Sequence, residues 1–132
     1  MIGILLVAHA NIASENKAAI EHILGEQQQF AAIDIYDSAV STKDKAALAA
    51  AMMRLDDGQG VLVLVDLLGA TPWNVTCDIA QHQHAEVISG FNLPAVIKAV
   101  SLRQETVSLA EVAQACVQAG QHYMRMYVQG ET

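Results

Sequence analysis

The chain alternates between short, continuously apolar segments and longer segments whose apolar residues recur at helical spacing. Ile2–Ala8 and Val61–Val65 are unbroken apolar runs, the pattern of strands that are buried on both faces. Phe30–Tyr36 and Ala85–Ser89 are also strand-like. Strands that alternate with helices in this way predict a parallel sheet with helices on both sides.

Helical patterns occupy residues 14–24, 42–55, a segment that opens at 71, and residues 93–102 and 108–120. Thr71 is a suitable N-cap, and Pro72 suits the first helical position because its missing N–H would have no partner there. Ser108 and Glu111 have the spacing of a capping box, which predicts the start of the last helix.

The tail of the chain has a different pattern. His122–Val128 alternates polar and apolar residues, which predicts a half-exposed antiparallel edge strand. An exposed edge of this kind is a liability unless it is paired, either within the chain or with a second copy. The expected fold class is therefore α/β, an open and mainly parallel four-stranded sheet with helices on both faces and a C-terminal edge strand.

Length and composition predict one globular domain over residues 1–132. The chain is 53% apolar and 16% charged, so it can bury enough apolar surface to offset its ordering entropy, which excludes disorder. Seven basic residues face 14 acidic ones, a net charge of −7 that disfavours nucleic acid and anionic membranes as partners. No apolar run reaches membrane-spanning length, and the apolar start has no basic leader of the kind found in signal peptides. Cys77 and Cys116 lack any paired spacing, and we expect a cytoplasmic protein.

Ligands of open α/β sheets gather at the carboxyl ends of the strands, so the residues that follow each strand are the candidates for chemistry. His9 follows the first strand, Asp37 the second, Asp66 the third, and Gly90–Asn92 the fourth. Taken alone, His9 is equally well explained as a structural histidine and Asp66 as a turn residue. Together they predict a carboxylate that fixes the histidine tautomer and leaves the other ring nitrogen free as a nucleophile.

The turn after Asp66 supplies a third element of this site. Leu67, Gly69, Ala70 and Thr71 lead into a helix whose N-terminal N–H groups can bind an anion. A histidine, an orienting carboxylate and an anion cradle together predict a histidine that takes up a phosphoryl group. The turn amides and the helix end would supply the compensating charge, so we expect no metal and no cofactor.

The other polar residues give weaker evidence of a functional site. His82 and His84 have no apparent third metal ligand, and a solvated surface position explains them better. We expect Asp34 and Asp37 to serve only as solvated strand ends. The sequence has no Walker A motif, no dinucleotide-binding glycine pattern and no serine-nucleophile elbow.

Three segments resemble the mannose-type enzyme IIA domains of the bacterial phosphoenolpyruvate:sugar phosphotransferase system: VAHANIA (7–13), VLVLVDLLGATPWN (61–74) and ISGFNLPAVIKAV (88–100). The resemblance implies that His9 is phosphorylated by the phosphocarrier HPr and passes the group to a separate IIB partner. It also implies that Asp66 orients His9, that residues 67–71 hold the phosphoryl group, and that Asn92 shapes the same crevice. A homodimer that exchanges its last strand is implied as well.

The chain departs from the family pattern at three positions near the expected phosphate. Ala10 and Ala70 stand where glycines are usual, and Leu67 stands where some members carry a hydroxyl residue. Two other classes of protein stay open at this point. One is a receiver-like signalling domain phosphorylated on Asp66, and the other is the phosphotransfer subunit of dihydroxyacetone kinase. Sugar transport and a purely regulatory role are also both compatible with the sequence.

Overall fold

The computed structural model describes residues 1–36 and 40–130, which fold into one parallel sheet and two layers of helices. Within these ranges the sheet order is β2-β1-β3-β4, and all neighbouring strands are parallel. The strands are β1 (Gly3–His9), β2 (Phe30–Ile35), β3 (Val61–Val65) and β4 (Ala85–Ser89). The helices are α1 (Ile12–Leu24), α2 (Thr42–Leu55), α3 (Thr71–Ala80), α4 (Leu93–Leu102) and α5 (Leu109–His122).

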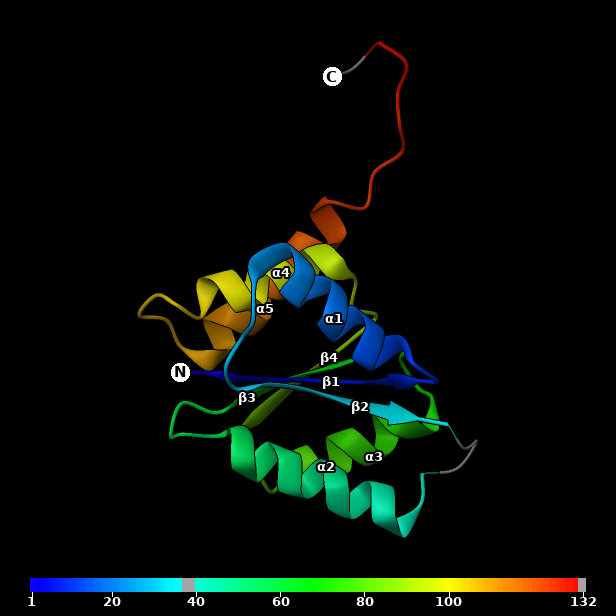
Figure 1. The fold of residues 1–132 in the computed structure, drawn as a ribbon, viewed down its shortest axis with the longest axis vertical. Helices are drawn as coiled ribbons and strands as arrows, with labels where there is room; N and C mark the ends of the chain where they lie inside the picture. The colour runs from blue at the N-terminus through cyan, green and yellow to red at the C-terminus, as the bar shows by residue number, and fades with distance from the viewer. Residues whose placement is uncertain (37–39, 131–132) are drawn as a thin grey trace.

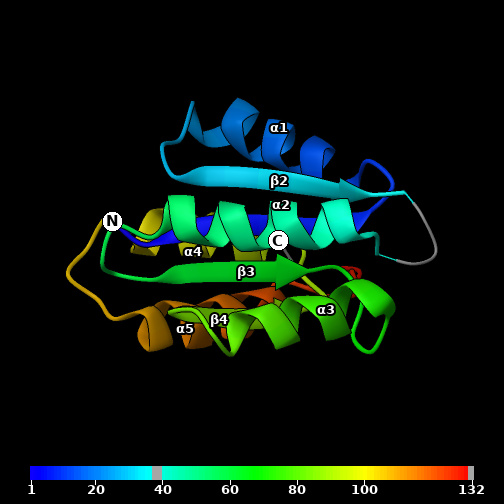
Figure 2. The same cartoon turned by 90° about the horizontal axis from the view of Figure 1, so that it is seen from below.

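Helices cover both faces of the sheet, as the continuous apolar runs predict. Figures 1 and 2 show α1, α4 and α5 on one face and α2 and α3 on the other. Alternate residues of β1 and β3 enter the two cores: Leu6 and Leu64 pack toward α1, α4 and α5, whereas Leu5 and Val63 pack toward α2. All four side chains are fully buried. Because β1 and β3 are adjacent central strands, their carboxyl ends meet at the middle of one sheet edge.

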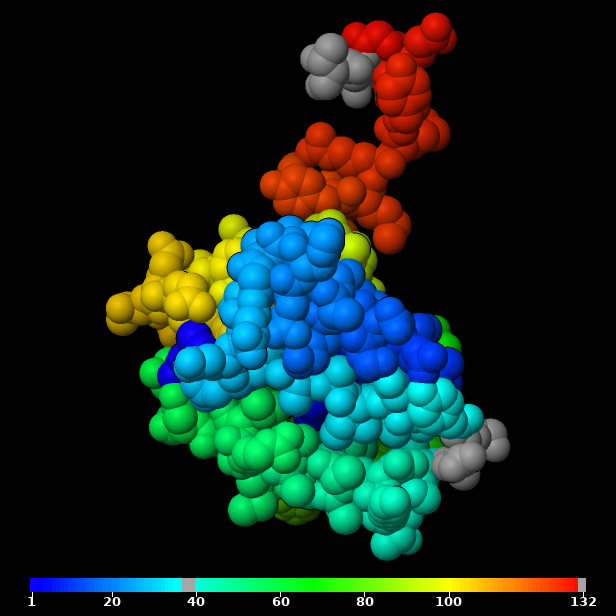
Figure 3. All heavy atoms as spheres, viewed as in Figure 1, coloured from blue at the N-terminus to red at the C-terminus, as the bar shows by residue number. Residues whose placement is uncertain are grey.

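The predicted C-terminal edge strand is wrong for the single chain. His122 is the last residue of α5, and the N–H of Tyr123 continues the helical pattern by donating to the carbonyl of Ala119. Residues 124–128 form no strand and project from the body of the molecule, away from the sheet (Figures 1 and 3). An alternating pattern needs a sheet edge to pair with, and the tail does not pair with the free side of β4 in its own chain.

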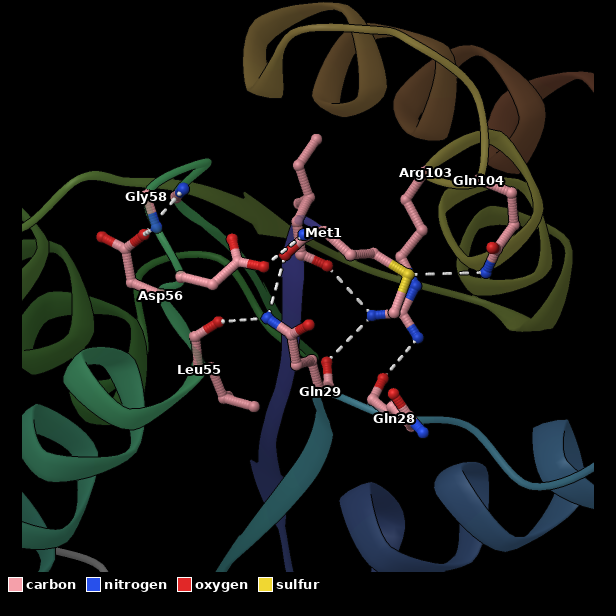
Figure 4. Close-up of polar contacts among 11 residues, drawn as sticks. Met1, Gln28, Gln29, Leu55, Asp56, Gly58, Arg103 and Gln104 are labelled. Atoms are coloured by element: carbon pink, nitrogen blue, oxygen red, sulfur yellow. Dashed lines mark hydrogen bonds and ion pairs between the residues drawn. The ribbon is translucent and has the colours of Figure 1, made fainter.

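A buried arginine ties the amino edge of the sheet together (Figure 4). Arg103, at the end of α4, is 3% exposed and donates to the carbonyls of Ile2, Gln28 and Gln29 at 2.6–3.0 Å. No carboxylate among the described residues forms a salt bridge with it. Desolvation by burial lowers the pKa of the Arg103 guanidinium. The contacts join α4 to the segment that enters β2 and to the start of β1.

No helix within residues 1–36 and 40–130 is both long enough and apolar enough to cross a membrane.

Candidate functional site

His9 and Asp66 lie in direct contact at the carboxyl edge of the sheet. One carboxylate oxygen of Asp66, Oδ2, lies 2.9 Å from His9 Nδ1 and accepts a hydrogen bond from the His9 backbone N–H at 3.1 Å. Because β1 pairs with β3 up to Val7 and Val65, the residues that follow are brought side by side. The two contacts fix the imidazole ring relative to its own backbone.

The contact with Asp66 engages one ring nitrogen of His9 and leaves the other free. An ionised carboxylate only accepts hydrogen bonds, so Nδ1 carries the hydrogen and Nε2 keeps a lone pair. The His9 side chain is 43% exposed, whereas that of Asp66 is 14% exposed. The geometry therefore presents an oriented imidazole to solvent, with Nε2 free of hydrogen bonds to the described residues.

Asp66 itself is poorly placed to accept a group from solvent. Its Oδ2 is engaged by His9, and its Oδ1 is buried without a hydrogen-bond partner among the described residues. This arrangement suits an orienting carboxylate and disfavours the receiver-like alternative, in which Asp66 would be the accessible phosphoryl acceptor.

The turn between β3 and α3 lies next to this pair. Gly69 has a φ of +81°, a conformation that glycine adopts without steric cost. The prediction that Thr71 is the N-cap is wrong, because the carbonyl of Ala70 accepts the N–H of Asn74 and so closes the first helical turn one residue earlier. Ala70 is the N-cap, and Thr71 is the first residue of α3. Alanine has no side-chain oxygen with which to cap the helix.

Four helices begin at this edge of the sheet, and α3 differs from the other three. A side-chain oxygen accepts an N–H of the first turn in each of the others: Asp34 for α1, Ser41 for α2 and Asn92 for α4. No side chain among the described residues does so for α3. The N–H groups of α3 are therefore the ones that remain available to an anion beside His9.

Asn92 has a structural role that its place in the motif did not reveal. Its Oδ1 accepts the N–H of Ala95 at 3.0 Å, and its Nδ2 donates to the carbonyl of Gly120 at 3.0 Å. Asn92 thus caps α4 and binds the last turn of α5, and no hydrogen bond links it to His9 or Asp66 among the described residues. Its predicted contribution to the phosphate crevice stays a prediction.

The structure assigns a clear contact to Asp34, which was expected only to be a solvated strand end. Its carboxylate accepts the backbone N–H of Ser14 at 3.0 Å and the Ser14 hydroxyl at 2.6 Å. Asp37 lies outside the described residues. His82 and His84 are exposed, and residues 1–36 and 40–130 contain no cluster of three or more His, Cys, Asp or Glu that could hold a metal.

Exposed apolar side chains follow three of the strands, at the same edge of the sheet as the histidine. Ile12 and Tyr36 follow β1 and β2, and Leu67 and Leu68 follow β3; they are between 43% and 71% exposed. We refer to these four residues as the apolar rim. Apolar groups around an exposed reactive residue are typical of a surface that meets another protein.

The fold and the site define an open parallel α/β domain that presents an oriented histidine beside an uncapped helix N-terminus. Residues 3–117 match the family described as "PTS system fructose IIA component", where PTS is the phosphotransferase system. The chain therefore belongs to the mannose/fructose/sorbose family of PTS enzyme IIA components, which are phosphotransferase components.

Individual relatives agree with this assignment. The chain is 30% identical to the putative phosphotransferase enzyme IIA component YadI of Escherichia coli (strain K12) over 91% of its own length and 82% of the relative's. It is also 30% identical to the PTS system mannose-specific EIIAB component of the same strain, over 90% of its own length but only 37% of that relative's.

Solved structures show the same fold. The mannose/sorbose-specific IIA subunit from Enterococcus faecalis has a TM-score of 0.85 at 27% identity, with 99% of this chain and 98% of that chain covered. The phosphotransferase system component EIIA from Streptococcus agalactiae has a TM-score of 0.81 at 26% identity, with 96% and 97% covered. The prediction of a mannose-type IIA family and of an open parallel α/β fold is thus confirmed.

Proposed function

We propose that this enzyme IIA component carries a phosphoryl group on Nε2 of His9, which it accepts from the phosphocarrier HPr and passes to a IIB partner. The observation that carries the proposal is the 2.9 Å contact between His9 Nδ1 and Asp66 Oδ2, which leaves Nε2 free on an exposed ring. The family assignment supports a role as a phosphotransferase component.

The transfer step follows from this geometry. Nε2 of His9 attacks the phosphorus of the phosphohistidine on the carrier, so the new N–P bond forms as the carrier's N–P bond breaks. The hydrogen on Nδ1 stays in place, and the ring takes up positive charge. Asp66, which contacts Nδ1, stabilises that charge and holds the ring in the attacking orientation. Transfer to the IIB partner is the same step in reverse.

The negative charge of the phosphoryl group is balanced at the start of α3. We assign this role to the backbone of Leu67, Gly69, Ala70 and Thr71, with the Thr71 hydroxyl as a further donor. The absence of a side-chain cap on α3 supports the assignment, because uncapped N–H groups and the helix dipole both favour an anion. Gly69, with its positive φ, allows the backbone of the turn to curve around the group.

The apolar rim favours a protein as the phosphoryl donor and acceptor over a small molecule. Its four residues add exposed apolar surface to the same edge of the sheet as His9, and a partner protein can bury that surface when the two phosphoryl-carrying residues meet. The net charge of −7 does not by itself attract an acidic partner, so docking would depend on local complementarity at the rim.

We also propose a homodimer in which the tail of each chain pairs with the sheet of its partner. Tyr123, Met124, Met126, Tyr127 and Val128 are exposed in the single chain, and β4 lies at one end of the strand order with one side unpaired within the described chain. A hollow of about 400 Å³ lies between the end of β4 and the last turns of α5. A partner's tail laid along β4 would occupy this region.

The phosphoryl proposal is tested by mixing the protein with phosphoenolpyruvate, enzyme I and HPr and measuring its intact mass. We expect an increase of one phosphoryl group that is lost in acid and that His9→Ala abolishes. His82→Ala, which removes an exposed histidine elsewhere, is the matched control and should be modified normally. Equal phosphorylation of His9→Ala and the wild type would refute the assignment, and an acid-stable group dependent on Mg²⁺ would instead point to Asp66.

A further inference from the structure

The loop that follows His9 is held by the end of the neighbouring strand. Only Ala10 and Asn11 separate β1 from α1. The N–H of Ala10 donates to the carbonyl of Ile35 at 2.8 Å, and the hydroxyl of Tyr36 donates to the side chain of Asn11. Both residues of the loop before α1 are therefore hydrogen-bonded to the end of β2.

The third attachment is made by Asp34, and it replaces a helix cap. Asn11 is the N-cap of α1, but its side chain accepts from Tyr36 and caps nothing. The carboxylate of Asp34 accepts the Ser14 N–H at 3.0 Å and the Ser14 hydroxyl at 2.6 Å instead. A carboxylate held in this position satisfies a first-turn N–H and interacts favourably with the positive end of the helix dipole.

This attachment matters because the loop is strained. Ala10 has a φ of +51°, which costs a residue with a Cβ about 1–2 kcal/mol. Such a conformation persists only where the surroundings hold it in place. Since the loop is two residues long, a shift of α1 would move the backbone of His9, which is one of the two groups that contact Asp66.

We propose that Asp34 is a positioning residue for His9: by anchoring the first turn of α1 to β2, it keeps the imidazole aligned with Asp66. It also occupies the first-turn N–H of α1, so that α3 is the helix end left for the phosphoryl group. The inference rests on the proposed function for its effect on transfer, whereas the alignment of the ring can be tested without any transfer.

The test uses two substitutions at Asp34 and a matched control. Asp34→Ala removes both acceptors. Asp34→Asn keeps the shape of the side chain, with an oxygen for the Ser14 N–H and an amide that can donate to the Ser14 hydroxyl. Asp56→Ala is the control, because Asp56 also accepts two backbone N–H groups, from Gly58 and Gly60, but lies at the opposite edge of the sheet.

Two measurements are made on each folded variant. The ¹⁵N chemical shifts of the His9 ring at one fixed pH report how the hydrogen is shared between its two nitrogens. We expect the wild type, Asp34→Asn and Asp56→Ala to show the hydrogen on Nδ1, and Asp34→Ala to show a mixture. The rate of phosphoryl transfer from the phosphorylated carrier should fall between about tenfold and a hundredfold in Asp34→Ala alone, through kcat more than KM.

Several results would overturn the inference. One is an unchanged ring signature and rate in Asp34→Ala. Another is an equal loss in Asp56→Ala, which would indicate a general loss of stability. A third is an Asp34→Asn variant that transfers the phosphoryl group as slowly as Asp34→Ala. That result would attribute the effect of Asp34 to its charge and not to its hydrogen bonds. If the wild type takes up no phosphoryl group at all, the proposed function fails, and the ring signatures still decide the role of Asp34.

Discussion

Ala10 lies immediately after His9 with a φ of +51°, and this conformation predicts a stabilising substitution. Ala10→Gly removes the Cβ that makes the left-handed region costly, while glycine also adds freedom to the unfolded chain. We expect a net increase in the free energy of unfolding of about 0.5–1 kcal/mol, measured by urea denaturation.

The same substitution elsewhere in the chain is the control. Ala47→Gly lies at an exposed position within α2, where glycine should lower the free energy of unfolding by about 1 kcal/mol. Opposite signs for the two variants would attribute the effect to the backbone conformation at Ala10. A loss of stability in Ala10→Gly as large as that in Ala47→Gly would show that Ala10 is not strained.

Asp66→Asn tests whether the carboxylate orients His9 or has only a structural role. The amide oxygen can accept only as a neutral group, and the amide nitrogen can take the place of Oδ2 and turn the ring to the wrong tautomer. We expect phosphoryl transfer to His9 to slow by about 10²- to 10⁴-fold, measured by rapid quench with phosphorylated HPr. A transfer rate that matches the wild type, in a variant with the same thermal stability, would make Asp66 merely structural.

The pairing of His9 with Asp66 could be predicted from the sequence because both residues directly follow central, uniformly apolar strands. The role of Asp34 could not be predicted, because its partner Ser14 is 20 residues away and lies in a helix whose own N-cap would be expected to do the capping. Thr71 was misassigned for a related reason. A cap is defined by the carbonyl that closes the first turn, and that carbonyl belongs to Ala70.

At the scale of the elements, Arg103 joins three segments that are far apart in the chain. Its guanidinium donates to carbonyls at the start of β1 and in the loop before β2, more than 70 residues away (Figure 4). Arg103→Met should lower the free energy of unfolding by about 2–4 kcal/mol, because it leaves the buried carbonyl of Ile2 and the part-buried carbonyl of Gln28 without this donor. The measurement is urea denaturation.

Arg54→Met is the matched control, since Arg54 is exposed on α2. It should change stability by no more than about 0.5 kcal/mol. The free energy of unfolding of Arg103→Lys should lie between those of Arg103→Met and Arg54→Met, because one ammonium group cannot reach all the carbonyls that the planar guanidinium reaches. An Arg103→Met variant as stable as Arg54→Met would show that the carbonyls find other partners, such as water.

Most helices and strands were predictable because each has a local signal, such as the apolar run of β3 or the capping box at Ser108. The network of Arg103 has no local signal. A basic residue at the end of a helix is ordinarily a solvated one that interacts with the helix dipole. Its burial depends on how α4 packs over the amino ends of β1 and β2, which only the assembled fold determines.

At the scale of the whole molecule, the tail beyond α5 has a strand-like sequence pattern but pairs with no strand in the described part of the single chain. The alternating pattern of residues 122–128 is typical of a strand, yet residues 124–128 extend into solvent with their apolar side chains exposed (Figure 3). A second copy could supply the partner that this segment lacks in its own chain, and this is the basis of the proposed homodimer. A twofold exchange would use the same surface on both copies and would pair the free side of β4, whereas β2 would stay at the other edge of the sheet.

Removing the tail should therefore convert a dimer into a monomer. We expect multi-angle light scattering to give twice the chain mass for the full protein and the single-chain mass for a variant that ends at Tyr123. Met126→Pro should also weaken the dimer, because proline removes a backbone donor from the strand, whereas Met126→Val keeps it and serves as the control. A full chain that is monomeric at every concentration tested would contradict strand exchange. A truncated chain that remains dimeric would also contradict it and would place the contact between copies elsewhere on the molecule.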